Sequence, residues 1–131
     1  MVIELTPETF FEKVNVHGPL NVVMHYGINC GPCKLTMPNF DAVAGHFEEH
    51  NITNVKFYKF HQWDENYKEF VETNNINVNG VPTFRYYYVG EIVNEETRAF
   101  FDGNELKQHI LSTVHAITTT LGDFNLYATT S

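Results

Sequence analysis

The stretch that decides the fold is residues 20–34, with the sequence LNVVMHYGINCGPCK. Its first seven residues, 20–26, are apolar and rich in β-branched side chains, which predicts a buried strand that ends at the following glycine. From Pro32 onward, apolar residues recur at roughly helical spacing, which predicts a helix. Both cysteines of the chain, Cys30 and Cys33, therefore lie where a strand passes into a helix.

The spacing of these two cysteines favours a reactive thiol pair over a disulfide that stabilises the fold. A disulfide between Cys30 and Cys33 would close a loop too short to stabilise a fold much, because that stabilisation grows with loop length. At the first turn of a helix, unpaired N–H groups and the positive end of the dipole favour a thiolate. Cys30 is the predicted nucleophile, and Cys33 is the predicted resolving thiol that attacks the mixed disulfide.

Two motifs together resemble the thioredoxin family. The first is Cys-Gly-Pro-Cys-Lys after a hydrophobic strand, with Pro38 in the same helix. The second is Gly80-Val81-Pro82-Thr83, before the aromatic strand 84–89, which resembles the cis-proline loop of the family. The resemblance implies that Pro82 follows a cis peptide bond and faces the cysteines, and that Val81 offers backbone hydrogen bonds to a bound polypeptide.

The resemblance implies an α/β protein with the thioredoxin fold, in which helices flank a central mixed sheet in the order β-α-β-α-β-α-β-β-α. It covers about residues 2–117. The expected domain is 1–117, and the tail 118–131 either docks on the domain or is disordered. The implied site residues are the catalytic Cys30 and Cys33, the active-site loop residues Asn29, Gly31, Pro32 and Lys34, and the substrate-binding residues Tyr26, Val81 and Pro82.

The implied function is reduction of protein disulfides through a dithiol–disulfide cycle of Cys30 and Cys33. The partners would be disulfide-containing client proteins and an electron donor of the thioredoxin-reductase or glutathione type. No bound cofactor is expected, since the chain has no nucleotide-binding glycine motif. One alternative is a thioredoxin-fold binding module with weak redox activity, and another is a disulfide isomerase or oxidase, which would need an oxidising compartment.

The chain departs from the family pattern beside the cysteines. Met24 takes the place of a buried aspartate held to assist proton transfer at the resolving cysteine. The lysine that usually pairs with that aspartate maps to Phe57, or to Lys56 or Tyr58 if the strand register slips by one residue. Water, His61 or Tyr58 is then expected to accept the proton of Cys33.

Two further departures lie at the rim of the predicted site. Asn29 and Tyr26 replace two tryptophans of the family pattern, which makes the rim more polar. The segment 98–101 lacks the glycine that normally opens the substrate groove. The rate, the redox potential and the set of clients are therefore less firmly implied than the dithiol chemistry.

Other elements follow from local signals. A strand is expected over 2–5, a helix capped by Thr6 with Pro7 at its first position, a strand over 55–60, and a hairpin of 83–89 with 92–94. Asp64 is expected to cap a helix that turns four apolar residues toward the core: Trp63, Tyr67, Phe70 and Val71. The capping box that starts at Asp102 precedes a last helix with one apolar stripe, expected to end near residue 117.

Composition bounds the class of protein. The 131 residues are 43% hydrophobic and 15% aromatic, which fits one domain. The formal net charge is −8, with 16 acidic against 8 basic residues, and this disfavours binding to nucleic acid or to an anionic membrane. The N-terminal residues lack the basic start and apolar core of a signal peptide, so a cytoplasmic, thiol-reducing location is expected. The chain is also expected to be a monomer.

Metal and nucleobase sites are the alternatives to be weighed. Cys30 and Cys33 could form half of a zinc site with His25 or His61, but zinc usually takes four ligands and the chain has no second cysteine pair. The sequence from His46 to His50 matches His-x-x-Glu-His, although a polar helix end is the simpler interpretation. The run 86–88 of three tyrosines could stack nucleobases, but packing in a sheet is favoured. No metal is therefore expected.

Overall fold

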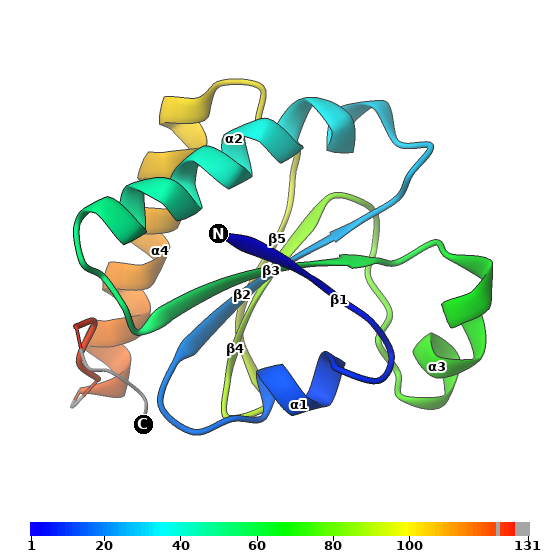
Figure 1. Cartoon of the computed structure of the whole chain (residues 1–131), viewed down its shortest axis with the longest axis horizontal. Helices are drawn as coiled ribbons and strands as arrows, with labels where there is room; N and C mark the ends of the chain where they lie inside the picture. Colours follow the sequence, from blue (N-terminus) through cyan, green and yellow to red (C-terminus); the bar gives the residue numbers. More distant parts are fainter. Residues whose placement is uncertain (123, 128–131) are drawn as a thin grey trace.

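A computed structural model of the chain describes residues 1–122 and 124–127. In this part of the chain, five strands form one sheet in the order β1-β3-β2-β4-β5 (Figure 1). The strands are β1 (Val2–Leu5), β2 (Leu20–Tyr26), β3 (Val55–His61), β4 (Thr83–Tyr88) and β5 (Glu91–Thr97). β1, β3 and β2 run parallel, whereas β4 is antiparallel to β2 and β5. The sheet is therefore mixed, as expected.

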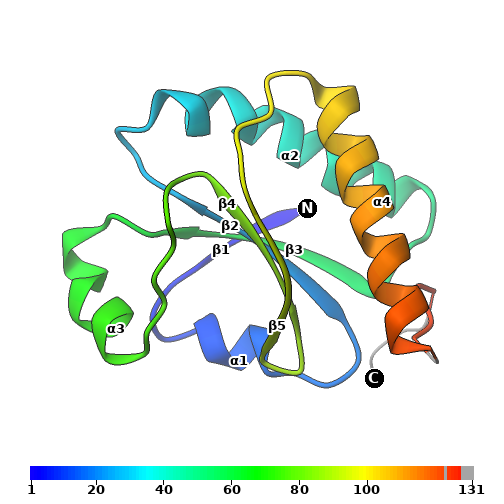
Figure 2. The ribbon, with the colours of Figure 1, turned by 180° about the vertical axis from the view of Figure 1, so that it is seen from behind.

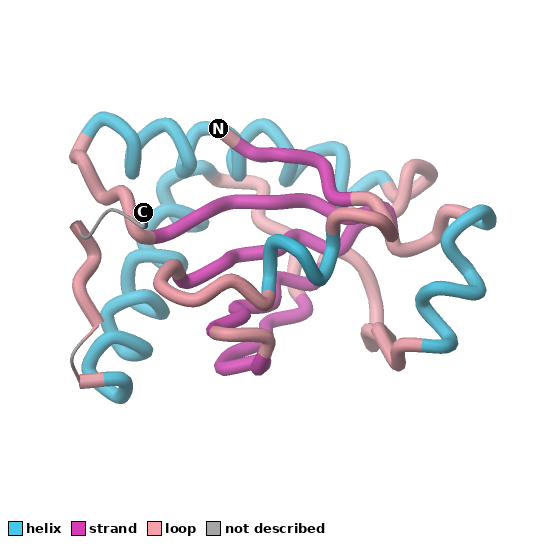
Figure 3. Tube along the Cα trace, turned by 60° about the horizontal axis from the view of Figure 1, so that its bottom comes forward, coloured by secondary structure: helices cyan, strands magenta, loops and turns pink. Residues whose placement is uncertain are grey.

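Helices cover both faces of this sheet. α2 (Gly31–Glu49) and α4 (Gly103–Leu121) pack on one face, and α1 (Phe10–Val14) and α3 (Lys68–Thr73) lie on the other, with the 3₁₀ turn η1 (Glu65–Tyr67) before α3 (Figures 1 and 2). Figure 3 shows a long helix along one face of the strands and a short helix in front of their other face. The order of elements matches the predicted β-α-β-α-β-α-β-β-α.

The central strand β2 supplies side chains to two hydrophobic cores because strand residues alternate between faces. Val22 and Met24 lie in the core under α2 and α4, together with both cysteines. Val23 lies in the core on the opposite face, which contains Phe10 of α1. The two cysteines, which follow β2 at the start of α2, are thereby held against a packed layer on the α2 face.

The first helix begins later than predicted. α1 starts at Phe10 with Thr9 as its N-cap, and Thr6 with Pro7 does not start it. The backbone N–H groups of Thr9 and Phe10 both donate to the carbonyl of Thr6, so residues 6–9 form a turn. The N–H of Thr6 donates to Oγ1 of Thr9 at 2.9 Å, which adds a further hydrogen bond between the two ends of this turn.

The prediction that Trp63 points into the core is wrong. Its side chain is 55% exposed, while the neighbouring Gln62 takes the buried position. Asp64 does act as a cap, because its carboxylate accepts a hydrogen bond from the backbone of Asn66, but it caps η1 and not α3. Val71 is buried as expected, and the rings of Tyr67 and Phe70 pack half-buried on the same core.

The last helix continues beyond its predicted end. α4 runs to Leu121, so a boundary after residue 117 falls inside a helix. Residues 124–127 dock on the domain: the backbone N–H of Asn54 donates to the carbonyl of Leu126 at 2.9 Å, and the ring of Phe124 meets that of Tyr88 edge-on at 5.7 Å. Residues 123 and 128–131 of the predicted tail lie outside the described residues.

The hairpin closes through a two-residue turn at Val89 and Gly90, which have φ angles of 49° and 78°. Such a turn needs positive φ at both positions, and this ends β4 one residue earlier than predicted. β5 then pairs over Glu91–Thr97, which is longer than the predicted 92–94. No helix in the described part of the chain is long and apolar enough to cross a membrane.

Candidate active site

Cys30 and Cys33 meet at the start of α2, where they form a disulfide with an S–S distance of 2.21 Å. Cys30 is the N-cap residue, and its Sγ accepts a hydrogen bond of 3.1 Å from the backbone N–H of Cys33. Cys30 is 6% exposed and Cys33 is 1% exposed, so the first sulfur is the more accessible of the two. The helix N-terminus thus directs a backbone N–H at the sulfur that would carry charge in the reduced state.

The loop around Pro82 lies against this disulfide. The carbonyl oxygen of Val81 is 3.8 Å from Sγ of Cys30, and the Val81–Pro82 peptide bond is cis, as predicted. The carbonyl of Pro82 accepts a hydrogen bond of 3.1 Å from the backbone N–H of Arg98. The hydroxyl of Thr83 donates to the carbonyl of Gly80 at 2.6 Å, so the loop is held on both sides of the proline.

The segment that leads into Cys30 is fixed by the end of β3. The backbone N–H of Ile28 donates to Nε2 of His61 at 3.2 Å, and the His61 ring stacks on Tyr26 with centroids 5.3 Å apart. A Cβ built on Gly27 would lie 2.2 Å from Cε3 of Trp63, so the indole rests directly on that glycine. Sequence reasoning missed this role of Trp63, although a glycine after a buried strand can mark such a close approach.

The remaining loop residues lie on the surface around the disulfide. Asn29, Gly31, Pro32 and Lys34 are exposed. Tyr26 is half-buried, and its hydroxyl donates to the carboxylate of Glu4 at 2.8 Å, away from the sulfurs. Burial and this carboxylate raise the pKa of Tyr26, so the phenol stays neutral.

The position of the missing acid is apolar, but the residue opposite it on the next strand is a lysine. Met24 is fully buried in the same core as Cys33, and Phe57 lies in that core as well. Lys56 is exposed and Tyr58 belongs to the core on the opposite face, so Phe57 is the residue that faces the Met24 side. The register pairs Met24 with Lys59 and Phe57 with Val22, so the residue placed to pair with a side chain at position 24 is Lys59 and not, as predicted, Phe57.

Neither side chain suggested as a base for Cys33 is placed for that role. Nε2 of His61 accepts from Ile28, and its Nδ1 lies 3.4 Å from a carboxylate oxygen of Asp64. Tyr58 lies across the sheet, where burial raises its pKa. Cys33 instead lines a hollow of about 380 Å³ together with Met37, Lys34 and Asp41. Of the three predicted bases, water therefore remains.

Metal ligands do not gather in the described residues. No group of three or more His, Cys, Asp and Glu side chains comes together there. His25, considered as a zinc ligand with the cysteines, lies on the other face of the sheet beside Phe10, with ring centroids 6.1 Å apart. Nδ1 of His50 donates to the carbonyl of His46 at 2.9 Å, which is a polar helix end.

His25 belongs to a buried polar network. Its Nδ1 lies 2.7 Å from Oε1 of Gln62 and its Nε2 lies 3.2 Å from the hydroxyl of Tyr87. The amide nitrogen of Gln62 donates to the carbonyl of Ile76 at 2.5 Å, which ties this network to the segment before Val81. Desolvation lowers the pKa of His25 to about 3, so the ring is neutral near pH 7.

Comparisons with known proteins agree with this geometry. The thioredoxin family profile matches residues 1–115. A curated relative, the chloroplastic F-type thioredoxin of Mesembryanthemum crystallinum, is 35% identical over 102 residues, which are 77% of this chain and 49% of the relative. The chain thus spans about half the length of that relative.

Two solved structures share the fold. The long form of thioredoxin f from spinach chloroplast has a TM-score of 0.68 and 25% identity, over 88% of this chain and 84% of its own. Thioredoxin f2 of Chlamydomonas reinhardtii has a TM-score of 0.63 and 24% identity, over 93% and 97%. These matches confirm the predicted thioredoxin fold. By profile, sequence identity and structure, the chain belongs to the thioredoxin family.

Proposed function

We propose that this chain is a thiol–disulfide oxidoreductase that reduces disulfides of client proteins. The observation that carries the proposal is the position of the Cys30–Cys33 disulfide, with the N–H of Cys33 on the first sulfur and the carbonyl of Val81 3.8 Å from it. Family membership adds support, and together these findings favour an oxidoreductase over a pure binding module.

The reaction transfers two electrons from the dithiol to the client. The thiolate of Cys30 attacks one sulfur of the client disulfide, so that an S–S bond forms to Cys30 and the client S–S bond breaks. The released client thiolate takes up a proton. The thiolate of Cys33 then attacks Sγ of Cys30 and expels the second client thiolate, which leaves the Cys30–Cys33 disulfide seen in this structure.

The client is held between the two loops that meet at Cys30. We place its chain along the backbone of Val81 and Pro82, because the carbonyl of Val81 faces the reacting sulfur. This position is bordered by four exposed residues: Asn29, Gly31, Pro32 and Lys34. Half-buried Tyr26 lies at the start of the same loop, where its ring stacks on His61. Water in the hollow beside Cys33, which Lys34 and Asp41 also line, accepts the proton of that thiol, because neither His61 nor Tyr58 is placed to do so.

An electron donor must return two electrons and two protons to the disulfide. A reductase of the thioredoxin type or a glutathione-type thiol fits this need, with no bound cofactor in the chain itself. We expect a monomer that acts in a thiol-reducing compartment. The curated relative is chloroplastic, so the cytoplasmic location expected from the sequence stays a prediction that a fluorescent fusion in the host cell would test.

Two measurements test the proposal. The protein should accelerate the reduction of insulin by dithiothreitol, and the Cys33→Ser variant should accumulate a mixed disulfide with a client, whereas Cys30→Ser should not. The redox potential of Cys30 and Cys33 should be about −270 mV, as for a reductant, and not about −120 mV, as for an oxidant. Failure of the chain to cycle between dithiol and disulfide would refute the assignment.

A further inference from the structure

Trp63 is a large aromatic side chain that stays exposed beside the active site. Its indole rests on Gly27, three residues before Cys30, so its position is fixed relative to the reacting sulfur. Exposed aromatic surface of this kind often marks a binding site, and tryptophan is among the residues that contribute most to binding. Ile28, also exposed, continues this apolar surface toward Cys30.

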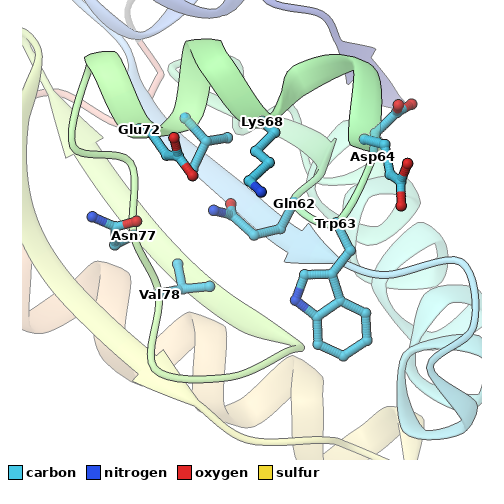
Figure 4. Close-up of a pocket in the computed structure, with 9 residues that line it drawn as sticks. Gln62, Trp63, Asp64, Lys68, Glu72, Asn77 and Val78 are labelled. Atoms are coloured by element: carbon cyan, nitrogen blue, oxygen red, sulfur yellow. The ribbon is translucent and has the colours of Figure 1, made fainter.

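Two hollows meet at this indole. One, of about 290 Å³, runs from Trp63 to Ile28 and Asn29, directly before Cys30. The other, of about 360 Å³, runs from Trp63 along α3 to Asn77 and Val78 (Figure 4). The first hollow therefore borders Asn29, next to the position proposed for the client, and the second ends at Val78, three residues before Val81.

The charge around Trp63 is negative. Asp64 and Glu65 border both hollows, and Glu72 borders the second, where Lys68 is the one cation among the lining residues. His61 lines the first hollow, with its Nδ1 turned to Asp64. The formal charge of −8 on the whole chain has the same sign. This surface therefore complements a positively charged ligand.

We propose that Trp63, Asp64 and Glu65, which we call the Trp63 surface, bind a lysine or arginine side chain of the client polypeptide close to the cysteine under attack. The cation packs on the exposed face of the indole while the two carboxylates balance its charge. The proposal rests on the proposed function and refines it, because it makes this chain a reductase that selects disulfides flanked by basic residues.

The test uses two synthetic disulfide peptides that differ only in their flanking residues, lysine and arginine in one and glutamate in the other. The wild-type chain should show a kcat/KM about tenfold higher for the basic peptide, in keeping with the size of a cation–π contact aided by charge. Trp63→Ala and Glu65→Gln should each lower this ratio, chiefly by raising KM for the basic peptide. Trp63→Phe should retain part of it.

Glu91→Gln is the matched control, because Glu91 is an exposed carboxylate on β5 outside both hollows. It should leave the ratio as in wild type, and thermal unfolding of each variant checks that it folds. Equal kcat/KM for the two peptides, a preference for the acidic one, or an unchanged ratio in Trp63→Ala would overturn the proposal.

A binding measurement separates this proposal from the proposed function. Trp63 is the only tryptophan of the chain, so its fluorescence reports the occupancy of this surface. A basic peptide with serine in place of its cysteines should shift that fluorescence, and the acidic peptide should not. If the chain reduces no disulfide but shows this shift, only the proposed function fails; if it reduces disulfides without the shift, only the Trp63 surface fails.

Discussion

Met24 is fully buried on β2, in the same core as Cys33. A carboxylate at this position could accept the proton of Cys33, and general-base assistance of this kind typically contributes about 10²–10⁴-fold. We expect Met24→Asp to reduce disulfides at least about tenfold faster than wild type, as measured by a single-turnover assay. The same change should lower the free energy of unfolding by about 3 kcal/mol, because it buries a carboxyl group in an apolar core.

Met24→Asn is the matched control for this prediction. It places a side chain of the same shape and similar polarity at position 24 but supplies no base. It should therefore lose stability without gaining rate. An unchanged rate in Met24→Asp would mean that water reaching Cys33 through its hollow already meets the need for a base.

His25 should make stability depend on pH. Its pKa is about 3 in the fold, against an ordinary value of about 6.5 in an unfolded chain. The unfolded state therefore binds a proton that the native state does not, so stability falls as the pH drops from about 6.5 toward 3. The loss attributable to His25 between pH 7 and pH 5 should be about 2 kcal/mol in urea denaturation.

The His25→Leu variant isolates this contribution. It leaves Gln62 and Tyr87 without their partner, so its stability at pH 7 should fall by about 1–3 kcal/mol. Its slope of stability against pH between 7 and 5 should nevertheless be shallower than that of wild type. An equal slope in both proteins would show that other groups, and not His25, produce the dependence.

At the scale of elements, the strands and the helix around the cysteines were predictable because local and tertiary preferences agree there. β2 has the bounds expected from its apolar run, and a helix follows from Gly31 as the spacing of apolar residues predicted. Trp63 shows the opposite case. Its apolar character suggested the core, but Gln62 is buried instead because its amide bonds to His25 and Ile76. Such a partnership between distant residues leaves no local signal.

The sequence motifs identified the two cysteines and the proline of the site, but they did not identify the residues that hold the surrounding loop in place. The motifs named Cys30, Cys33 and Pro82, which the structure brings together. The anchoring of Ile28 by His61 depends on β3 ending beside β2, and that register is a tertiary property. The exclusion of Tyr58 as a base likewise required knowing which face of β3 it occupies.

Docking of residues 124–127 should contribute to stability without affecting activity. Phe124 packs on the core beside Tyr88, whereas Cys30 lies beyond the opposite end of β2. Phe124→Ala should lower the free energy of unfolding by about 2 kcal/mol, less than a fully buried phenylalanine would. Phe101→Ala, which removes an exposed phenylalanine, should change it by less than about 0.5 kcal/mol. Denaturant titration of both variants measures the difference, and equal losses would contradict the docking.

At the scale of the whole molecule, the net charge of −8 should steer charged substrates toward or away from the disulfide. Cystamine is a small cationic disulfide, and oxidised glutathione is an anionic one. At low salt, the second-order rate constant should be higher for cystamine, and it should fall as salt is added. The rate constant for oxidised glutathione should rise over the same range, because the Debye length shrinks from about 30 Å at 0.01 M to about 8 Å at 0.15 M.

A charge-reversed variant shows whether the field of the whole chain or the local surface causes this steering. The double substitution Glu12→Lys with Glu91→Lys changes two exposed positions outside the two hollows at Trp63 and brings the net charge from −8 to about −4. Long-range steering follows total charge, so the salt dependence for cystamine should fall by about half. The preference for basic peptides, which depends on contact with Trp63, should persist in the same variant. Loss of that preference here would mean that net charge alone, and not a fitted surface, selects the clients.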